Sequence, residues 1–196
     1  MLDVLRDTGA LHLPGDVLEI GVLLGGGSYK LAKLLEREAP DKRLIAVDVF
    51  DPSFDRTACL DGTPMADFYL RYFDQIGAER DQRAIYDEVT ASCANIVTLA
   101  EDSATVELPT KALCFAFVDG NHSAEYVRSD FEKAWALLSP GGIIAIHDYG
   151  HDLPPVTHTV HKLLGEHAED VARVWLSGII IFVQRETAVR PTGRTP

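Results

Sequence analysis

The stretch "DVLEIGVLLGGGSYKLAKLLERE" (residues 16–38) contains the pattern that decides the fold. It opens with a short apolar run of strand length and closes with a segment in which Leu31, Leu34 and Leu35 recur at helical spacing. The three consecutive glycines between them let the backbone turn sharply and approach a ligand closely. The stretch therefore predicts a strand, a glycine-rich turn and an amphipathic helix.

Four further apolar runs of strand length follow along the chain: "RLIAVDV" (43–49), "IVTLAED" (96–102), "ALCFAFVDG" (112–120) and "GGIIAIHDY" (141–149). The helical-period stretch "SAEYVRSDFEKAWALL" lies between the last two. Such alternation predicts a parallel sheet that is covered by helices on both faces.

The end of the chain makes this outline more specific. "VARVWL" (171–176) and "IIIFVQ" (179–184) are separated only by Ser177 and Gly178, and so short a link permits an antiparallel hairpin but no parallel crossover. We therefore expect a doubly wound, Rossmann-like α/β fold. Its mostly parallel sheet should have seven strands and end in a C-terminal antiparallel hairpin.

Length and composition predict one domain. A chain of 196 residues, 46% of them hydrophobic, suits a single core. We expect this domain to span residues 1–185 and the polar tail, residues 186–196, to be disordered.

The segment 49–94 is roughly twice the length of an ordinary crossover. Two interpretations stay open. It can be a crossover with an extra helix, "MADFYLRYFDQI" (65–76), packed on the core, or a lid or substrate wall, because long inserts at strand carboxyl ends often carry binding.

The charge limits the classes of partner. Acidic residues outnumber basic ones, 30 against 18, and the formal charge of -12 disfavours nucleic acid. No run approaches the ~20 continuous apolar residues that cross a bilayer, and residues 1–16 lack a basic region followed by an apolar one. We expect a cytoplasmic protein with no membrane partner.

Two acids accompany the glycine-rich turn. The spacing Glu19-x-Gly21-x-x-x-Gly25 differs from the GxGxxG of dinucleotide-binding folds. Asp48 ends the second predicted strand, where a carboxylate can accept both hydroxyls of a ribose. A glycine turn alone can be purely structural, but turn, helix amino terminus and acid together indicate a nucleoside-bearing cofactor.

Polar side chains also follow the fourth and fifth predicted strands, in "FVDGNH" and "IIAIHDY": Asp119, His122, His147 and Asp148. Ligands of open α/β sheets bind at the carboxyl ends of the strands. Two carboxylates brought together there repel each other unless something positive lies between them, so we expect a divalent cation. Oxygen ligands favour Mg²⁺, and an added imidazole widens the choice to Mn²⁺, Fe²⁺ or Zn²⁺.

Each of these residues also has a structural interpretation. His122 can cap the helix that begins near Ser123, Asp148 can cap the next segment, and His147 can be a hydrogen-bonded core histidine. Their joint position at two strand ends beside the glycine-rich turn favours a functional role.

These motifs together resemble those of the class I S-adenosylmethionine-dependent methyltransferases. "LEIGVLLGGGS" is similar to the first motif of that family, Asp48 to its ribose-binding acid, and "LSPGGIIAIHDY" to the Pro-Gly-Gly turn that leads into its fifth strand. The predicted hairpin is similar to the family's inserted antiparallel strand. The resemblance covers about residues 14–184.

The resemblance implies S-adenosylmethionine as the cofactor, with Glu19 near the methionine ammonium and Asp48 on the ribose. "AEDS" (100–103) falls where relatives contact adenine, although Asp102 can equally be the N-cap of the next turn. The implied cofactor contacts are Glu19, Gly21, Gly25, Gly26, Gly27, Ser28, Asp48, Asp102, Ser103 and Asp119.

Within that family, the strand-end residues resemble the small metal-dependent O-methyltransferases of the macrocin, mycinamicin and catechol types. Members hold Mg²⁺ with an Asp after the fourth strand and an acidic pair after the fifth. Asp119 and Asp148 match, but His147 stands where the pair's first acid would be. The resemblance implies Asp119, His147 and Asp148 as metal ligands, and a sugar, polyketide or phenol as the acceptor.

A metal-bound hydroxyl has a lowered pKa, and a nearby histidine can take its proton. We expect His122 to be this base, with Asp119 and His147 as the other catalytic residues. Metal-independent N- or S-methylation and a catalytically silent cofactor-binding module stay open. Because many relatives are oligomers, homodimerisation through the 49–94 segment is a further expectation. His151, in a Pro-flanked loop close to Asp148, is a further active-site candidate, and the roles of His158 and His161 stay open.

Overall fold

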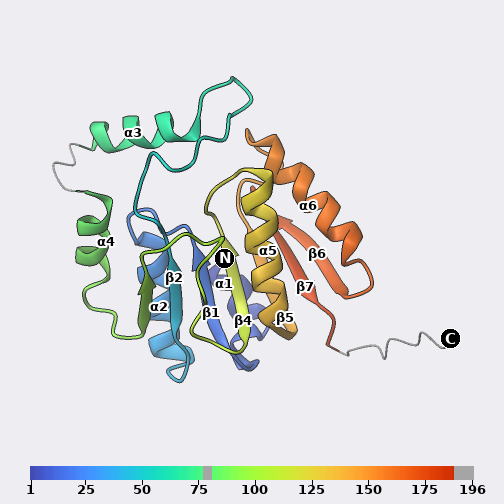
Figure 1. Cartoon of the computed structure of the whole chain (residues 1–196). Helices are drawn as coiled ribbons and strands as arrows, with labels where there is room; N and C mark the ends of the chain where they lie inside the picture. Colours follow the sequence, from blue (N-terminus) through green and yellow to red (C-terminus); the bar gives the residue numbers. More distant parts are fainter. Residues whose placement is uncertain (77–80, 188–196) are drawn as a thin grey trace.

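The computed structural model describes residues 1–76 and 81–187. Within these residues, seven strands form one sheet in the order β3-β2-β1-β4-β5-β7-β6 (Figure 1). The strands are β1 (Asp16–Ile20), β2 (Leu44–Val47), β3 (Ile96–Leu99), β4 (Leu113–Val118), β5 (Leu138–Ile146), β6 (Val171–Ser177) and β7 (Ile180–Arg185). Strands β1 to β5 are parallel, whereas β7 runs antiparallel to both β5 and β6. The predicted doubly wound sheet with its C-terminal hairpin is confirmed.

The central strands end at the same level. Strand β4, "LCFAFV", is buried along its whole length because helices cover both faces of the sheet. Ile20 of β1 pairs with Val47 of β2 and Val118 of β4, and Val118 pairs with Ile146 of β5. The residues that follow these four strands therefore gather at one edge of the sheet.

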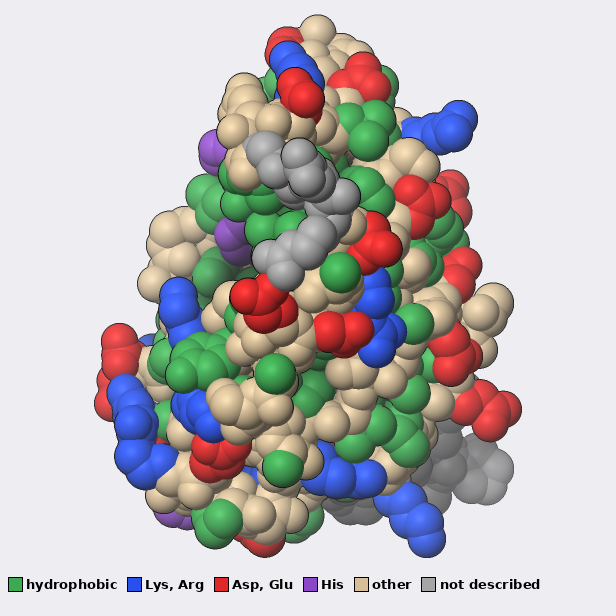
Figure 2. Space-filling view, turned by 90° about the vertical axis from the view of Figure 1, so that its left-hand side faces the viewer, with side chains coloured by type: hydrophobic (Ala, Val, Ile, Leu, Met, Phe, Trp, Pro, Cys, Tyr) green, Lys and Arg blue, Asp and Glu red, His purple; other side chains and the backbone are tan. Residues whose placement is uncertain are grey.

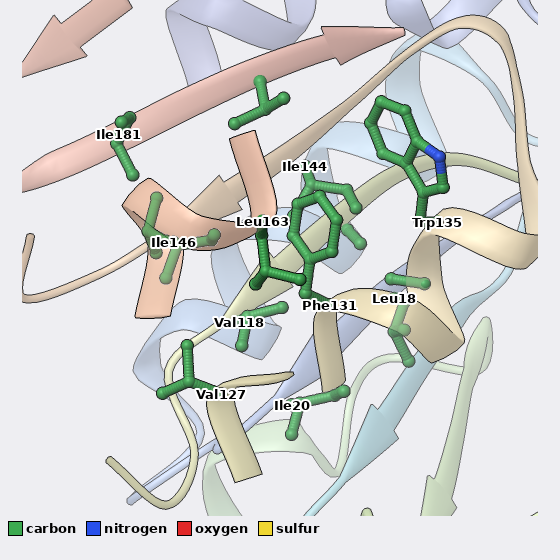
Figure 3. Packing of buried hydrophobic residues seen from close by; sticks show 14 of the residues in the cluster. Leu18, Ile20, Val118, Val127, Phe131, Trp135, Ile144, Ile146, Leu163 and Ile181 are labelled. Carbon is green, nitrogen blue, oxygen red and sulfur yellow. The ribbon is translucent and has the colours of Figure 1, made fainter. Parts of the chain in front are cut away.

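Helices cover the sheet on both faces, as predicted. The helices are α1 (Leu2–Asp7), the short 3-10 helix η1 (Ala10–His12), α2 (Gly26–Glu38), α3 (Met65–Gln75), α4 (Gln82–Thr90), α5 (Ala124–Leu137) and α6 (Pro154–Glu166). One core layer packs α1 and α2 against the sheet, and another packs α5 and α6. Figure 3 shows Phe131 of α5 and Leu163 of α6 in this second layer, near Val118 of β4.

The 49–94 segment contains both α3 and α4. Met65, at the start of α3, joins the core layer of α5 and α6, whereas Phe68 and Leu70 of the same helix are about half exposed. In Figure 1, α3 lies above the carboxyl ends of the parallel strands. Figure 2 faces the left-hand side of Figure 1, where α3 and α4 lie, and shows hydrophobic side chains at the surface of its upper part. The role of the segment as a lid stays a prediction.

Two further sequence predictions concern the C-terminal tail and membrane-spanning segments. Most of the tail expected to be disordered, residues 188–196, lies outside the described residues. Across residues 1–76 and 81–187, no helix combines the length and the apolar character needed to span a membrane.

Candidate active site

A cleft lies at the carboxyl ends of β1, β2 and β4. Its empty space of about 730 Å³ includes volume that is open to solvent. Four predicted cofactor contacts line it: Gly21, Asp48, Ser103 and Asp119. The 49–94 segment contributes Asp51, Pro52, Phe54, Asp55, Tyr69 and Gln82.

The glycine-rich turn is closely packed. Gly21 has a φ of 82°, and a Cβ atom added there would overlap the backbone carbonyl of Asp119. A Cβ atom on Gly27 would overlap the carboxyl group of Glu19. Gly25, the N-cap of α2, also has a φ of 82°. Glycine at these positions lets β1, β4 and α2 meet beside the cleft.

Glu19 is a buried acid beneath this turn. Its side chain is 2% exposed, and its Oε2 accepts a hydrogen bond from the Ser28 hydroxyl at 2.5 Å. Burial raises the pKa of Glu19 to about 8, and the charges of Asp119 and Asp48 act in the same direction. A cationic group beside it, such as an amino-acid ammonium, would favour the carboxylate form.

Asp48 connects the end of β2 to the turn. Its carboxylate accepts the backbone N–H groups of Val22, at 2.9 Å, and Phe50, at 2.6 Å. Burial raises its pKa, although these hydrogen bonds oppose the shift. The residue borders the cleft, and its contact with a ribose stays a prediction.

The structure places Asp102 in a turn. Its Oδ1 accepts the N–H of Ala104 and its Oδ2 accepts the hydroxyl of Tyr126, both at 2.9 Å. The neighbours of Asp102, Glu101 and Ser103, line the cleft. The geometry agrees with the capping interpretation of Asp102, and its contact with adenine stays a prediction.

The strand-end residues Asp119, His122, His147 and Asp148 form one group, here called the carboxylate–histidine cluster. Ligand atoms of Asp119, His122 and Asp148 all lie within 4.8 Å of one another. His122 Nε2 is 2.9 Å from Asp148 Oδ2 and 3.9 Å from Asp119 Oδ1. Asp148 has a φ of 56°, which is uncommon for a residue other than glycine.

His122 is the buried histidine of the cluster, with a side chain 4% exposed. Its Nδ1 lies 2.5 Å from Asp55 Oδ2. Although Nε2 is close to Asp148, the two groups lack the alignment of a hydrogen bond, and Nε2 has no hydrogen-bond partner among the described residues. Burial lowers the pKa of His122, but Asp148 and Asp55 outweigh it and raise the pKa to about 9.

His147 is the more accessible histidine, with a side chain 31% exposed. Its Nδ1 lies 3.1 Å from Asp119 Oδ1 and 3.3 Å from Asp148 Oδ1. Hydrogen bonding to these carboxylates raises the pKa of His147 to about 10. Burial favours a higher pKa for Asp148, but His122 and His147 hold it well below its usual range.

The cluster fits a divalent cation. Two carboxylates converge with an imidazole nitrogen that is buried and unpartnered, which is a donor set that Mg²⁺, Mn²⁺, Fe²⁺ or Zn²⁺ accepts. The converging set contains His122, whereas the sequence predicts Asp119, His147 and Asp148. His147 lies beside the same two carboxylates.

Sequence reasoning did not find Asp55. Its side chain is buried and contacts His122, 67 residues later in the chain. The only available signal was the abundance of Asp in the 49–94 segment, which does not distinguish Asp55 from its neighbours. The other histidines lie elsewhere: His161 Nε2 is 2.6 Å from the Tyr149 hydroxyl, and His151 Nδ1 is 3.9 Å from Asp152.

The fold and its cleft are typical of α/β proteins that bind a ligand at the carboxyl ends of the strands. The family model described as "Methyltransferase domain" matches residues 18–149. The chain belongs to this family and is an S-adenosylmethionine-dependent methyltransferase. No curated protein sequence matches it.

Solved structures share the fold. The O-methyltransferase NovP is 16% identical, with a TM-score of 0.72 over 94% of this chain and 77% of NovP. CalS11, a TDP-rhamnose 3'-O-methyltransferase of calicheamicin biosynthesis, is 20% identical, with a TM-score of 0.63 over 93% of this chain and 76% of CalS11. TomG from Streptomyces achromogenes, solved with S-adenosylmethionine, is 18% identical, with a TM-score of 0.58 over 95% and 79%.

Proposed function

We propose that this enzyme methylates a hydroxyl oxygen of a small molecule, with a divalent cation held by the carboxylate–histidine cluster. The observation that carries the proposal is the convergence of Asp119, His122 and Asp148 beside the cofactor cleft. NovP, CalS11 and TomG are O-methyltransferases, which supports oxygen as the methylated atom.

The histidines differ in exposure, and this difference favours separate roles. His122, with Nε2 buried among carboxylates, suits a cation ligand alongside Asp119 and Asp148. His147 is more accessible, so an acceptor can reach it. A cation that neutralises Asp119 and Asp148 would lower the raised pKa of His147, and the ring would then suit the base that takes the hydroxyl proton. This assignment exchanges the two histidine roles expected from the sequence. A divalent cation in this place would supply a Lewis acid that lowers the pKa of the acceptor hydroxyl.

The 49–94 segment is the proposed wall of the acceptor site. Tyr69 of α3 lines the cleft together with Pro52 and Phe54 of the same segment. Apolar and aromatic walls suit an acceptor with a hydrophobic body, such as a polyketide or phenol, or a sugar carried on one. The excess of acidic residues favours such acceptors over nucleic acid.

The test is an assay of S-adenosylhomocysteine release with a panel of hydroxylated, amine and thiol acceptors. The protein is treated with a chelator and assayed with and without Mg²⁺, Mn²⁺, Fe²⁺ or Zn²⁺. We expect turnover with a hydroxylated acceptor that stops after chelation and returns with a cation. Turnover restricted to amines or thiols would contradict O-methylation, and turnover unaffected by chelation would contradict the role of the cation.

A further inference from the structure

Asp55 lies in the stretch that joins β2 to α3 and, in the sequence, does not directly follow a strand. Its side chain is only 7% exposed, although it carries a carboxylate. Its Oδ2 lies 2.5 Å from His122 Nδ1 and also accepts the backbone N–H of His122 at 3.1 Å. One carboxylate oxygen therefore holds both the main chain and the ring of this histidine.

This contact determines where the ring carries its hydrogen. A carboxylate can only accept a hydrogen bond, so the contact requires hydrogen on His122 Nδ1. In the neutral ring the lone pair is then on Nε2, which faces Asp148 at 2.9 Å and Asp119 at 3.9 Å. Carboxylates that bond the second nitrogen of a metal-binding histidine fix its tautomer and orientation in this way.

The same residue is bonded to the start of α3. The backbone carbonyl of Asp55 accepts the N–H of Ala66 at 2.7 Å, and its Oδ1 accepts the N–H of Thr57 at 2.9 Å. The carbonyl of Thr57 in turn accepts the N–H of Met65, the first residue of α3. The carboxylate thus has a fixed position relative to the first turn of this helix.

We propose that Asp55 is a positioning residue that holds His122 in the Nδ1–H form and aims Nε2 at Asp119 and Asp148. Because Asp55 is also bonded to the first turn of α3, the proposal links docking of the 49–94 segment to assembly of the cation site. Its functional consequence rests on the proposed function, whereas the state of the ring does not.

The chain offers a matched pair of variants. Asp55→Asn keeps the side-chain size but removes the negative charge that faces His122 Nδ1. Asp61→Asn is the control, because Asp61 Oδ1 accepts the N–H of Thr63 at 2.8 Å, two residues later as in the Asp55–Thr57 contact, but Asp61 is exposed. Thermal unfolding of both variants shows whether each one folds.

The first readout is the side-chain ¹H–¹⁵N spectrum of chelator-treated protein, with the His122 signal assigned through its loss in His122→Gln. We expect a hydrogen-bonded Nδ1–H signal in the wild type and in Asp61→Asn, and its loss or a large shift in Asp55→Asn. The second readout is calorimetry. Asp55→Asn should weaken Mn²⁺ binding by about 10- to 100-fold, while Asp61→Asn should leave Mn²⁺ binding unchanged.

An unchanged His122 signal together with unchanged Mn²⁺ affinity in folded Asp55→Asn would overturn the proposal. If that variant does not fold, the wild-type spectrum decides, because an unprotonated Nδ1 on His122 would overturn it equally. A wild type that shows the Asp55-dependent signal but binds no Mn²⁺ would contradict the proposed cation and leave the positioning role intact.

Discussion

Gly21 shows how a single residue lets the sheet end in a ligand cleft. It follows β1, has a φ in the left-handed region, and lies against the backbone of Asp119 at the end of β4. A side chain at Gly21 would push the glycine-rich turn away from Asp119, which belongs to both the cofactor cleft and the carboxylate–histidine cluster. The position therefore combines a conformational and a packing requirement.

Gly21→Ala should lower the free energy of unfolding by more than about 2 kcal/mol, because the backbone strain and the overlap with Asp119 add together. Gly26→Ala is the control, since a Cβ atom on Gly26 meets nothing within 4 Å and Gly26 is the first residue of α2. Urea unfolding measures both. Equal stabilities of the two variants would show that the turn tolerates a side chain.

At the scale of elements, helix α5 has an unusual inward face. Val127, Phe131 and Trp135 pack on the sheet, but Asp130 lies among them, fully buried, and neither carboxyl oxygen has a hydrogen-bond partner among the described residues. Burial raises the pKa of Asp130 to about 7 despite nearby Lys133. The carboxyl group of Asp130 therefore binds a proton more tightly in the folded protein than in the unfolded chain.

This difference makes the contribution of Asp130 depend on pH. Because its pKa is higher in the folded state, the stability it contributes is greatest at low pH and is lost as pH rises from about 4 to about 7. The Asp130→Asn variant cannot lose stability in this way. Its free energy of unfolding, relative to that of wild type, should therefore rise by about 3 kcal/mol between pH 5 and pH 8.

Urea unfolding across that pH range checks the Asp130 prediction. The exposed Asp74→Asn on α3 is the control and should show no such trend. A stability difference between Asp130→Asn and wild type that is constant from pH 5 to pH 8 would mean that Asp130 is ionised throughout.

Local sequence patterns predict most elements but not all. Apolar runs indicated the strands, and helical spacing indicated α2, α3 and α5. Strand β5 begins at Leu138 rather than at Gly141, because its pairing with β4 contains an irregularity that periodicity cannot show. The contacts of Asp55 with His122 were also beyond sequence reasoning, because no local pattern connects residues 67 positions apart.

The strand-end residues were easier to predict, since parallel strands bring their carboxyl ends to one edge. Asp119, His122, His147 and Asp148 were expected together and lie together. The sequence did not distinguish which histidine is buried, because that depends on Asp55 and the surrounding segment. The exposures, 4% for His122 and 31% for His147, needed the structure.

At the scale of the whole molecule, the cleft joins distant parts of the chain. Its lining extends from Ile20 to Asn121 and includes residues of the 49–94 segment. A ligand that contacts all of these parts stabilises the folded state as a unit, because the unfolded chain has no such cleft.

S-adenosylhomocysteine at about 100 times its dissociation constant should add about 2.7 kcal/mol to the free energy of unfolding. For a chain of this size, that corresponds to a rise in Tm of about 5–10 °C, which differential scanning calorimetry can measure. NAD at the same concentration is the control and should leave Tm unchanged, because the glycine spacing differs from that of dinucleotide-binding folds. A rise with NAD alone would contradict the cofactor assignment.

The central claim is that the carboxylate–histidine cluster holds a divalent cation. The most direct measurement is calorimetric titration of chelator-treated protein with Mg²⁺ and Mn²⁺ in the presence of S-adenosylhomocysteine. We predict one cation per chain in the wild type and in Asp152→Asn, an exposed acid of the adjacent loop. Binding should disappear in Asp148→Asn while cofactor affinity persists. No cation binding in the wild type, or equal binding in Asp148→Asn, would contradict the claim.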